Sequence, residues 1–220
     1  MNKKEISSNE MVNVENIINY NKKVEIKDNT FQKLMFIYSL AIRQIENTMK
    51  IIQDEYDILY EYKLIDNIKT RIKKPDHIVR KMKDKNLDIT YKDMITNIND
   101  IAGIRIICPM KKDIYEIQKI IQKMEDIHII KQKDYVKNPK ASGYSSYHII
   151  AEVPVRLSDK NMYIKTEIQI RTKTMDFWAE LEHEMIYKND NSSKKQKEWK
   201  ECAKLIAKLD NNMMKISSYN

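Results

Sequence analysis

The sequence predicts an α+β fold, in which strands in the middle of the chain form a sheet and helices flank it and extend from both ends. Residues 31–62 and 198–215 carry apolar side chains at three- and four-residue steps, which is typical of long amphipathic helices. Between them, residues 100–109 form an apolar run and residues 162–171 alternate between apolar and polar side chains. Both patterns indicate strands, the first largely buried and the second with two different faces.

The composition fits one domain with an anionic partner. At 220 residues the chain can bury one good core with helical appendages. The net charge of +8 favours nucleotides or nucleic acids as partners. The same chain holds 32 acidic residues, so its surface is mixed and charge alone does not separate these two partner classes.

The cysteines and the apolar runs indicate the compartment. Cys108 and Cys202 lie far apart and match no metal spacing, so we expect reduced structural thiols. No apolar run reaches membrane-spanning length, and the first ten residues lack the apolar core of a signal peptide. We therefore expect a soluble, cytoplasmic protein that does not contact a membrane.

Residues 1–62 are predicted to form a helical extension ahead of the sheet. We expect residues 1–10 to be frayed and residues 11–24 to form a short helix. Residues 31–62 contain neither glycine nor proline, and their apolar positions recur with helical spacing. They predict one long amphipathic helix, or two with a bend, that serves mainly as scaffold.

A strand predicted over residues 63–70 leads into a strongly basic segment. Arg71 and Lys73 precede Pro75, which suits the first turn of a helix that carries Lys81. Basic side chains at a strand end and on the next helix can converge on a polyphosphate, because bidentate Arg and mobile Lys groups suit that task. A solvated basic face is the alternative interpretation.

The strand at residues 100–109, DIAGIRIICP, holds two charged residues in an apolar run. Gly103 has no side chain, which leaves room for another group to approach the strand closely. Asp100 lies at the start of the strand and Arg105 within it. Buried charges need partners. The two form either an Asp–Arg ion pair between neighbouring elements or a metal-binding carboxylate and a nucleotide-binding guanidinium. The next predicted elements are a helix and a strand, over residues 111–124 and 127–136.

The loop KDYVKNPKASGYSSYH, residues 133–148, combines lysines, a glycine and aromatic side chains. Gly143 relaxes the backbone just before Tyr144, where a strand is predicted to begin. Alternation places three side chains on one face of that strand: Tyr144, Ser146 and His148. A base can stack on the tyrosine while phosphates lie near the lysines of the loop: Lys133, Lys137 and Lys140. A lysine-rich surface loop before an ordinary strand is the alternative.

The strand at residues 162–171 predicts one apolar and one polar face. The polar face carries Glu167, Gln169 and Arg171, which form either a solvated outer surface or part of a site. Thr172 can cap the following helix, in which Trp178 has the spacing of a core residue.

Residues 191–220 are predicted to support oligomerisation. A linker over residues 188–197 precedes the final amphipathic helix. Together with the long N-terminal helix, this helix carries more apolar surface than a small sheet can cover. We therefore expect a homo-oligomer.

Five motifs occur in order along the chain: Arg71–Lys73, DIAGIR, DY…NPK…GY…H, E-x-Q-x-R and W-x-x-x-EH…YK. With this order and spacing, residues 63–190 resemble the synthetase domain of the RelA/SpoT family, and in particular its stand-alone small alarmone synthetases. The resemblance implies a nucleotidyltransferase-like mixed β-sheet flanked by helices. It also implies the stringent-response reaction, in which pyrophosphate moves from ATP to the 3′-hydroxyl of GDP or GTP to give (p)ppGpp and AMP.

The resemblance assigns four basic residues to ATP: Arg71, Lys73, Lys81 and Arg105. The two arginines would sandwich adenine, and the two lysines would hold the phosphates. Asp100 and Glu167 would bind Mg²⁺, and Glu167 would also accept the proton of the 3′-hydroxyl. The residue chemistry agrees, because pyrophosphoryl transfer needs the charge of the donor phosphates neutralised. A metal held by only two carboxylates keeps water and substrate ligands, which is typical of Mg²⁺.

For the guanine nucleotide, the resemblance assigns six residues on the loop, the polar strand and the next helix: Lys140, Tyr144, His148, Gln169, Arg171 and Asp176. The tyrosine would stack on guanine, and the lysine and the histidine would hold acceptor phosphate. The glutamine and the arginine would support the strand face beside the metal. The aspartate would accept hydrogen bonds from the guanine edge.

Two positions depart from the family pattern. Ser145 follows Tyr144 where a basic residue is usual, and His77 lies where a small hydroxyl residue is common. We expect the first departure to weaken the hold on the 5′-phosphates of the acceptor and to admit GMP, with pGpp as the product. The chain shows no signature of an HD-type hydrolase, so we expect no hydrolysis of alarmone.

The resemblance also bears on partners and on the alternative function. It implies a homotetramer with single-stranded RNA or alarmone as a regulator, and we expect no DNA partner. The alternative function is a catalytically inactive module on the same fold that senses guanine nucleotides or RNA. Asp100 and Glu167 argue against it, because a binding module gains little from two acids that face phosphates.

Overall fold

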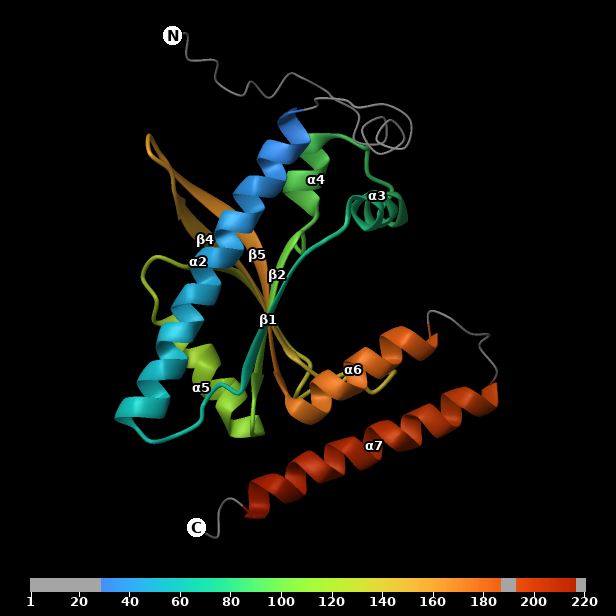
Figure 1. Cartoon of the computed structure of the whole chain (residues 1–220). Helices are drawn as coiled ribbons and strands as arrows, with labels where there is room; N and C mark the ends of the chain where they lie inside the picture. Colours follow the sequence, from blue (N-terminus) through green and yellow to red (C-terminus); the bar gives the residue numbers. More distant parts are fainter. Residues whose placement is uncertain (1–28, 187–192, 217–220) are drawn as a thin grey trace.

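The computed structural model describes residues 29–186 and 193–216, which form one sheet and its surrounding helices (Figure 1). The strands are β1 (Asn67–Ile72), β2 (Ala102–Cys108), β3 (His128–Asp134), β4 (Tyr147–Arg156) and β5 (Asn161–Thr172). The helices are α2 (Asn29–Leu59), α3 (Pro75–Asp84), α4 (Tyr91–Asn97), α5 (Lys111–Gln122), α6 (Lys173–Ile186) and α7 (Ser193–Ile216).

The strands form one mixed sheet in the order β1-β2-β5-β4-β3. The β2–β5 pair is parallel, and the β1–β2, β4–β5 and β3–β4 pairs are antiparallel. Parallel strands need a long crossover, and here α5, β3 and β4 lie between β2 and β5 in the chain. The predicted α+β fold with a mixed, helix-flanked sheet is confirmed.

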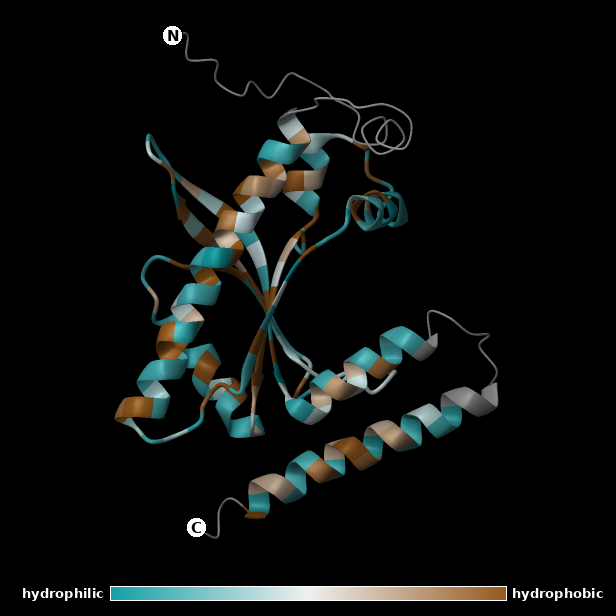
Figure 2. Cartoon of the chain, in the orientation of Figure 1, coloured by the Kyte–Doolittle hydropathy of each residue, from teal (hydrophilic) through white to brown (hydrophobic). Residues whose placement is uncertain are grey.

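One face of the sheet is apolar and carries the main core. Ile104 and Ile106 of β2, together with Ile168 of β5, are buried on this face. Figures 1 and 2 show α2 and α5 on this side, with hydrophobic residues recurring along α2. The helices contribute the buried residues Ala41, Ile45, Met49, Ile114, Ile117 and Ile121. Each fully buried isoleucine contributes roughly 1.5–3 kcal/mol of transfer free energy, so this cluster supplies much of the fold's stability.

A second cluster joins α3 and α4 to α2. Ile78 and Met82 of α3 are buried together with Met94 of α4. The helix α4 is an element that apolar periodicity did not predict, because seven residues are too few to show a clear repeat. A cap signal was present, since the hydroxyl of Thr90 accepts a hydrogen bond from the backbone N–H of Asp93 at 3.1 Å.

The other predicted helices and strands that fall within the described ranges are confirmed, with shifts at their ends. β4 begins at Tyr147 rather than at Tyr144, and α7 begins at Ser193, so the second half of the predicted linker is helical. The hydroxyl of Thr172 accepts a hydrogen bond from the backbone N–H of Met175 at 3.2 Å, as expected of a cap. The predictions for residues 1–10 and 11–24 lie outside the described residues.

Neither cysteine forms a disulfide. Cys108 is buried, whereas Cys202 is exposed on α7, so the structural role predicted for Cys202 is wrong. Within the described ranges, no helix combines the length and the apolar character needed to cross a lipid bilayer.

Candidate active site

The second face of the sheet is polar, and neighbouring strands place its side chains in rows. In one row Arg71 of β1 lies beside Gly103 of β2, which lies beside Glu167 of β5. The next row runs across β1, β2, β5 and β4, with Lys69, Arg105, Gln169 and His148. The strand order therefore gathers residues that are up to a hundred positions apart in the chain.

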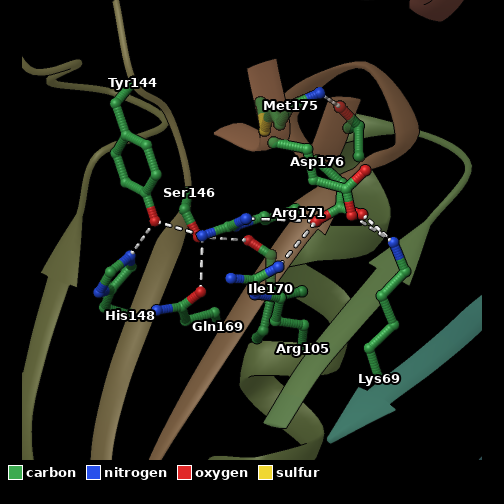
Figure 3. A network of polar contacts seen from close by, with 12 residues as sticks. Lys69, Arg105, Tyr144, Ser146, His148, Gln169, Ile170, Arg171, Met175 and Asp176 are labelled. Carbon is green, nitrogen blue, oxygen red and sulfur yellow. Dashed lines mark hydrogen bonds and ion pairs between the residues drawn. The ribbon is translucent and has the colours of Figure 1, made fainter. Parts of the chain in front are cut away.

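Arg171 is the centre of a buried hydrogen-bond network on this face (Figure 3). Its Nη2 donates to the hydroxyl of Tyr144 and to Oε1 of Gln169, both at 2.6 Å. Its Nη1 donates to Oδ1 of Asp176 at 3.2 Å, and its Nε to the hydroxyl of Ser146 at 3.4 Å. Arg171 is only 2% exposed, so the solvated outer surface considered for this strand face is wrong. A buried guanidinium needs such partners to offset its desolvation.

Glu167 lies at the edge of this network. Its Oε2 accepts a hydrogen bond from Gln169 at 2.8 Å, and its Oε1 lies 3.3 Å from Nδ1 of His148. The other ring nitrogen of His148 lies 2.8 Å from the Tyr144 hydroxyl (Figure 3). Glu167 is thus held in a fixed orientation by side chains of β4 and β5.

Asp100 lies just before β2 and is held between two lysines. Its Oδ2 accepts hydrogen bonds from Lys73 at 2.6 Å and from Lys81 at 2.7 Å. Lys73 follows β1 and Lys81 lies on α3, so the predicted convergence of a strand end and the next helix occurs around this carboxylate. The ion pair with Arg105 that the sequence left open is not formed. The Oδ1 atom of Asp100 is buried and has no hydrogen-bond partner within the described residues.

The carboxyl groups of Asp100 and Glu167 are both ionised at neutral pH. Burial acts to raise the pKa of Asp100, but the hydrogen bonds from Lys73 and Lys81 outweigh it, so the pKa lies below its ordinary value. Burial also acts to raise the pKa of Glu167, yet the hydrogen bond and charge of His148, with help from Arg71, lower it. The charge of Asp100 opposes this decrease, which means that the two carboxylates interact electrostatically.

These lowered pKa values predict how stability depends on pH. Each carboxylate stabilises the fold above its unfolded pKa, ordinarily 3.8 for Asp and 4.5 for Glu, and the contribution is lost as the pH falls through the lower folded pKa. Thermal melts from neutral pH to about pH 3 should therefore show a steeper acid loss for the natural protein than for Asp100→Asn. Equal acid slopes would contradict this assignment.

Arg71 and Arg105 occupy neighbouring rows of the polar face. Nη2 of Arg71 lies 4.0 Å from Oε2 of Glu167. A methyl group on Gly103 would lie 3.4 Å from Cγ and Nε of Arg71, which shows that the Arg71 side chain lies against β2 at this residue. Nη1 of Arg105 lies 4.0 Å from Oδ1 of Asp176. Burial lowers the pKa of Arg105, as do the charges of two neighbouring arginines.

Lys69 belongs to the site, although the sequence reasoning did not identify it. Its Nζ lies 2.7 Å from Oδ2 of Asp176 and 2.8 Å from Oε1 of Glu180. Alternation along β1 places Lys69 on the same face as Arg71, so a signal for it was present. Asp176 is only 4% exposed, and its carboxylate is held by Lys69 and Arg171 together.

Tyr144 is enclosed rather than open to solvent. Its ring packs edge-on against the rings of Tyr135 and His148. The ammonium group of Lys140 lies 4.6 Å from the ring centroid, and the guanidinium of Arg171 lies 5.1 Å from it. The structure therefore brings Lys140 to the site, over the aromatic face on which a base was expected to stack.

The two positions that depart from the family pattern, His77 and Ser145, lie outside the hydrogen-bond network around Arg171. His77 is exposed on α3 and lies 3.8 Å from the carboxylate of Asp76 on the same helix. Ser145 is half-buried and lines a cavity against α7 rather than the network around Tyr144.

The polar face combines two ionised carboxylates with surrounding cations: Arg71, Lys73, Lys81 and Arg105. Carboxylates that can share a divalent ion, within reach of groups that neutralise phosphate, are what phosphoryl-group transfer requires. On a mixed, helix-flanked sheet, this site defines a nucleotide-dependent transferase.

Comparison with known proteins places the chain within that class. Residues 70–192 match the model of the region found in RelA / SpoT proteins. The chain therefore belongs to the RelA/SpoT family, as the five motifs predicted.

The matches to individual relatives cover most of the chain. It is 42% identical over 184 residues to the GTP pyrophosphokinase YwaC of Bacillus subtilis, a match that covers 83% of this chain and 88% of YwaC. The structure resembles small alarmone synthetase 1 of B. subtilis bound to its product pppGpp, with a TM-score of 0.80, 28% identity and coverage of 87% and 98%. For small alarmone synthetase 2 of the same organism the TM-score is 0.78, with 38% identity and coverage of 86% and 98%.

Proposed function

We propose that the protein is a GTP/GDP diphosphokinase, which transfers pyrophosphate from ATP to the 3′-hydroxyl of a guanine nucleotide to make (p)ppGpp. The 3′-oxygen attacks the β-phosphorus of ATP, the bond between that phosphorus and the α,β-bridging oxygen breaks, and AMP leaves with that oxygen. The observation that carries the proposal is the pair of interacting, ionised carboxylates, Asp100 and Glu167, within a ring of cations. The relatives named GTP pyrophosphokinases support it.

The donor nucleotide is assigned to the side of the site formed by β1, β2 and α3. Arg71 and Arg105 are neighbours on the sheet face, and two planar guanidinium groups can bracket an adenine ring. Lys73 and Lys81 both bind Asp100. When ATP binds, both ammonium groups can move from this carboxylate to the ATP phosphates, which offer more negative charge. They would then neutralise the charge on the donor during transfer.

The donor set around Asp100 and Glu167 fits Mg²⁺. Both groups are ionised, and Oδ1 of Asp100 is a buried oxygen without a partner in the described residues. No cluster of three or more His, Cys, Asp or Glu side chains suited to a metal occurs in the described ranges, so a bound ion would complete its shell with water and substrate oxygens. When bound, Mg²⁺ would neutralise charge on the transferred phosphates.

Glu167 is assigned the role of accepting the proton of the attacking hydroxyl. Its lowered pKa keeps it ionised, and the contacts with Gln169 and His148 fix its orientation. A carboxylate in this state can accept a proton from a hydroxyl within hydrogen-bond reach. Gln169 and Arg171 act as positioning residues, because they hold Glu167 and Tyr144 rather than substrate.

The acceptor nucleotide is assigned to the side formed by β4, β5 and α6. Guanine can stack on Tyr144 once the Lys140 ammonium leaves the ring, and a departing Lys140 can pair with acceptor phosphate, with His148 beside it. Asp176 can accept hydrogen bonds from the guanine edge if Lys69, whose side chain is 40% exposed, releases its Oδ2 atom. Binding of guanine thus competes with contacts that are formed within the protein.

The choice among GMP, GDP and GTP as acceptor tests the effect of Ser145, which stands where the family usually has a basic residue. With serine in place of a basic residue, we expect relaxed selection for the length of the 5′-phosphate chain and measurable conversion of GMP to pGpp. The test is kcat/KM for GMP, GDP and GTP, measured with the natural protein and with Ser145→Arg. The arginine variant should shift preference toward GTP. A strong GTP preference in the natural protein would contradict the expectation.

We further propose a cytoplasmic homotetramer, with single-stranded RNA or alarmone as a regulator. The described helices leave large apolar side chains exposed: Ile58 and Leu59 on α2, and Leu205 and Leu209 on α7, the last two 65% and 50% exposed. Light scattering should show an oligomer for the natural protein and a smaller species for Leu205→Asp/Leu209→Asp, because charges at a buried contact are costly. Lys208→Asp serves as the matched control on α7. A monomeric natural protein would contradict the proposal.

The sensor alternative is not favoured. The chain's relatives over most of its length are named as enzymes, and the two carboxylates that such a module would not need are present and held in place.

A further inference from the structure

Lys69 brings a positive charge to the carboxylate that is assigned to the guanine edge. Its ammonium group lies 2.7 Å from Oδ2 of Asp176 and 2.8 Å from Oε1 of Glu180, and Figure 3 shows it reaching Asp176 from β1. Asp176 and Glu180 are four residues apart on α6, so they lie on one face of the helix and hold the same ammonium group. The side chain of Asp176 is nearly buried, whereas those of Lys69 and Glu180 are 40% and 51% exposed.

The two oxygens of Asp176 have different neighbours. Oδ1 accepts a hydrogen bond from Arg171 at 3.2 Å, and Nη1 of Arg105 lies 4.0 Å from it. Oδ2 accepts a hydrogen bond from Lys69 at 2.7 Å. A carboxylate oxygen can accept two hydrogen bonds, so both oxygens can bind a further donor. Along this cluster a donor on Lys69 is therefore followed by two acceptors on Asp176.

This order of groups complements the edge of guanine. Guanine presents O6 as an acceptor, followed by N1–H and the 2-amino group as donors, and cytosine pairs with it through one donor and two acceptors. Adenine presents an amino donor and then a ring nitrogen acceptor. It would place donor against donor at Lys69 and a lone pair against the carboxylate. Such a site rejects the wrong base because its polar groups are left unpaired.

The network around Arg171 connects this cluster to the expected position of the base. Nη2 of Arg171 donates to the hydroxyl of Tyr144, and its Nη1 donates to Asp176 (Figure 3). The ring on which guanine is expected to stack and the carboxylate that reads its edge are thus held by one guanidinium group. A base stacked on Tyr144 can extend along Arg171 and bring its edge to Asp176 and Lys69.

We propose that Lys69 is a specificity-determining residue that donates a hydrogen bond to O6 of the guanine acceptor. One N–H of its ammonium group moves from Oδ2 of Asp176 to O6, the guanine N1–H takes its place at Oδ2, and Glu180 continues to hold the ammonium group. Guanine thereby replaces the contact that it displaces, whereas a base without O6 breaks this contact and replaces nothing. The inference rests on the proposed function, because it concerns the acceptor of that reaction.

Two analogues of GDP separate the contacts of Lys69 from those of Asp176. In 6-thio-GDP, sulfur, a weak acceptor, replaces O6, and both N1–H and the 2-amino group remain. IDP keeps O6 and N1–H but lacks the 2-amino group. The affinity of the full chain for GDP and for each analogue is measured by calorimetry, with a non-hydrolysable ATP analogue filling the donor position.

The three nucleotides are compared in the natural protein, in Lys69→Met and in a control, Lys131→Met. Methionine has a length similar to that of lysine but neither charge nor donor, and Asp176 keeps Arg171 as its partner in the variant. Lys131 is exposed on β3, outside the site, so the control makes the same chemical change on another strand. Circular dichroism establishes that each variant is folded.

We expect the natural protein and Lys131→Met to bind 6-thio-GDP about tenfold or more weaker than GDP, the effect of losing a hydrogen bond to a charged donor. Lys69→Met should bind GDP as weakly as 6-thio-GDP. The preference for GDP over IDP should be the same in all three proteins, because the 2-amino group contacts Asp176 and not Lys69.

Equal affinities of the natural protein for GDP and 6-thio-GDP would overturn the proposal without any variant. If Lys69→Met lost affinity for both by the same factor and kept the preference for GDP, Lys69 would serve only as a counter-ion of Asp176, and the proposal would again be wrong. AMP release is measured separately. Protein that reads O6 in the binding experiment but releases no AMP would contradict the proposed function alone, and an active enzyme that binds both nucleotides equally would contradict only the role of Lys69.

Discussion

Replacing Glu167 with glutamine is expected to lower the rate of AMP and alarmone formation by about 10²–10⁴-fold, the usual effect of losing a positioned general base. The amide has nearly the same size as the carboxylate, so the packing between β4 and β5 is preserved. It carries no charge and cannot take the proton of the 3′-hydroxyl. Binding of ATP and guanine nucleotide should survive, because neither depends mainly on this side chain. The measurement is AMP release under single-turnover conditions, together with nucleotide affinity by calorimetry.

Glu152→Gln is the matched control for this variant. Glu152 lies on β4, where it pairs with Lys165 rather than with the catalytic residues, and its side chain is 36% exposed. This control should retain natural turnover. Turnover of Glu167→Gln at the natural rate, in protein shown to bind both nucleotides, would contradict the role assigned to Glu167.

Replacing Arg171 with methionine is expected to destabilise the fold by about 3–5 kcal/mol, because it removes one partner of a buried ion pair and leaves the other unpaired. Asp176 would keep only Lys69 and the distant Arg105, and the oxygens of Tyr144 and Gln169 would lose their shared donor. For a chain of this length the melting temperature should fall by about 10 °C. Acceptor affinity should fall as well, because Tyr144 loses its anchor.

Arg156→Met makes the same chemical change at an exposed position of β4 and should have little effect on the melting temperature. Thermal unfolding by circular dichroism compares the two variants with the natural protein. If Arg171→Met melted with the control, the network around Arg171 would not be a source of stability.

The sequence predicted most of the elements, because their hydrophobic patterns are local properties of the chain. The alternation over residues 162–171 correctly placed Ile168 and Glu167 on opposite faces of β5, the first in the core and the second on the polar face. It did not reveal that the polar face is buried. That burial depends on β5 pairing with both β2 and β4, and on Tyr144 and Asp176 closing over Arg171, which are contacts between distant parts of the chain.

The partners of individual charges were harder to predict than their location. Asp100 was recognised as a charge that needs a partner, and the sequence left open an ion pair with Arg105 or a role as a metal ligand. Neither alternative included Lys73 and Lys81, which bind Asp100 in the structure, because their approach depends on where α3 packs. Lys69 was missed, since a single lysine on a short strand looks like any solvated residue. The cavity that Ser145 lines was equally hidden, because α7 reaches it from the far end of the chain.

The most direct test of the central claim is a nucleotide assay with anion-exchange separation. The purified protein is incubated with ATP and Mg²⁺, alone and with each of GMP, GDP and GTP. The proposed function predicts AMP together with a 3′-pyrophosphorylated guanosine nucleotide, and only when a guanine nucleotide is present. Protein that is folded, binds these nucleotides and yet releases no AMP with any acceptor would contradict the claim and favour the sensor alternative.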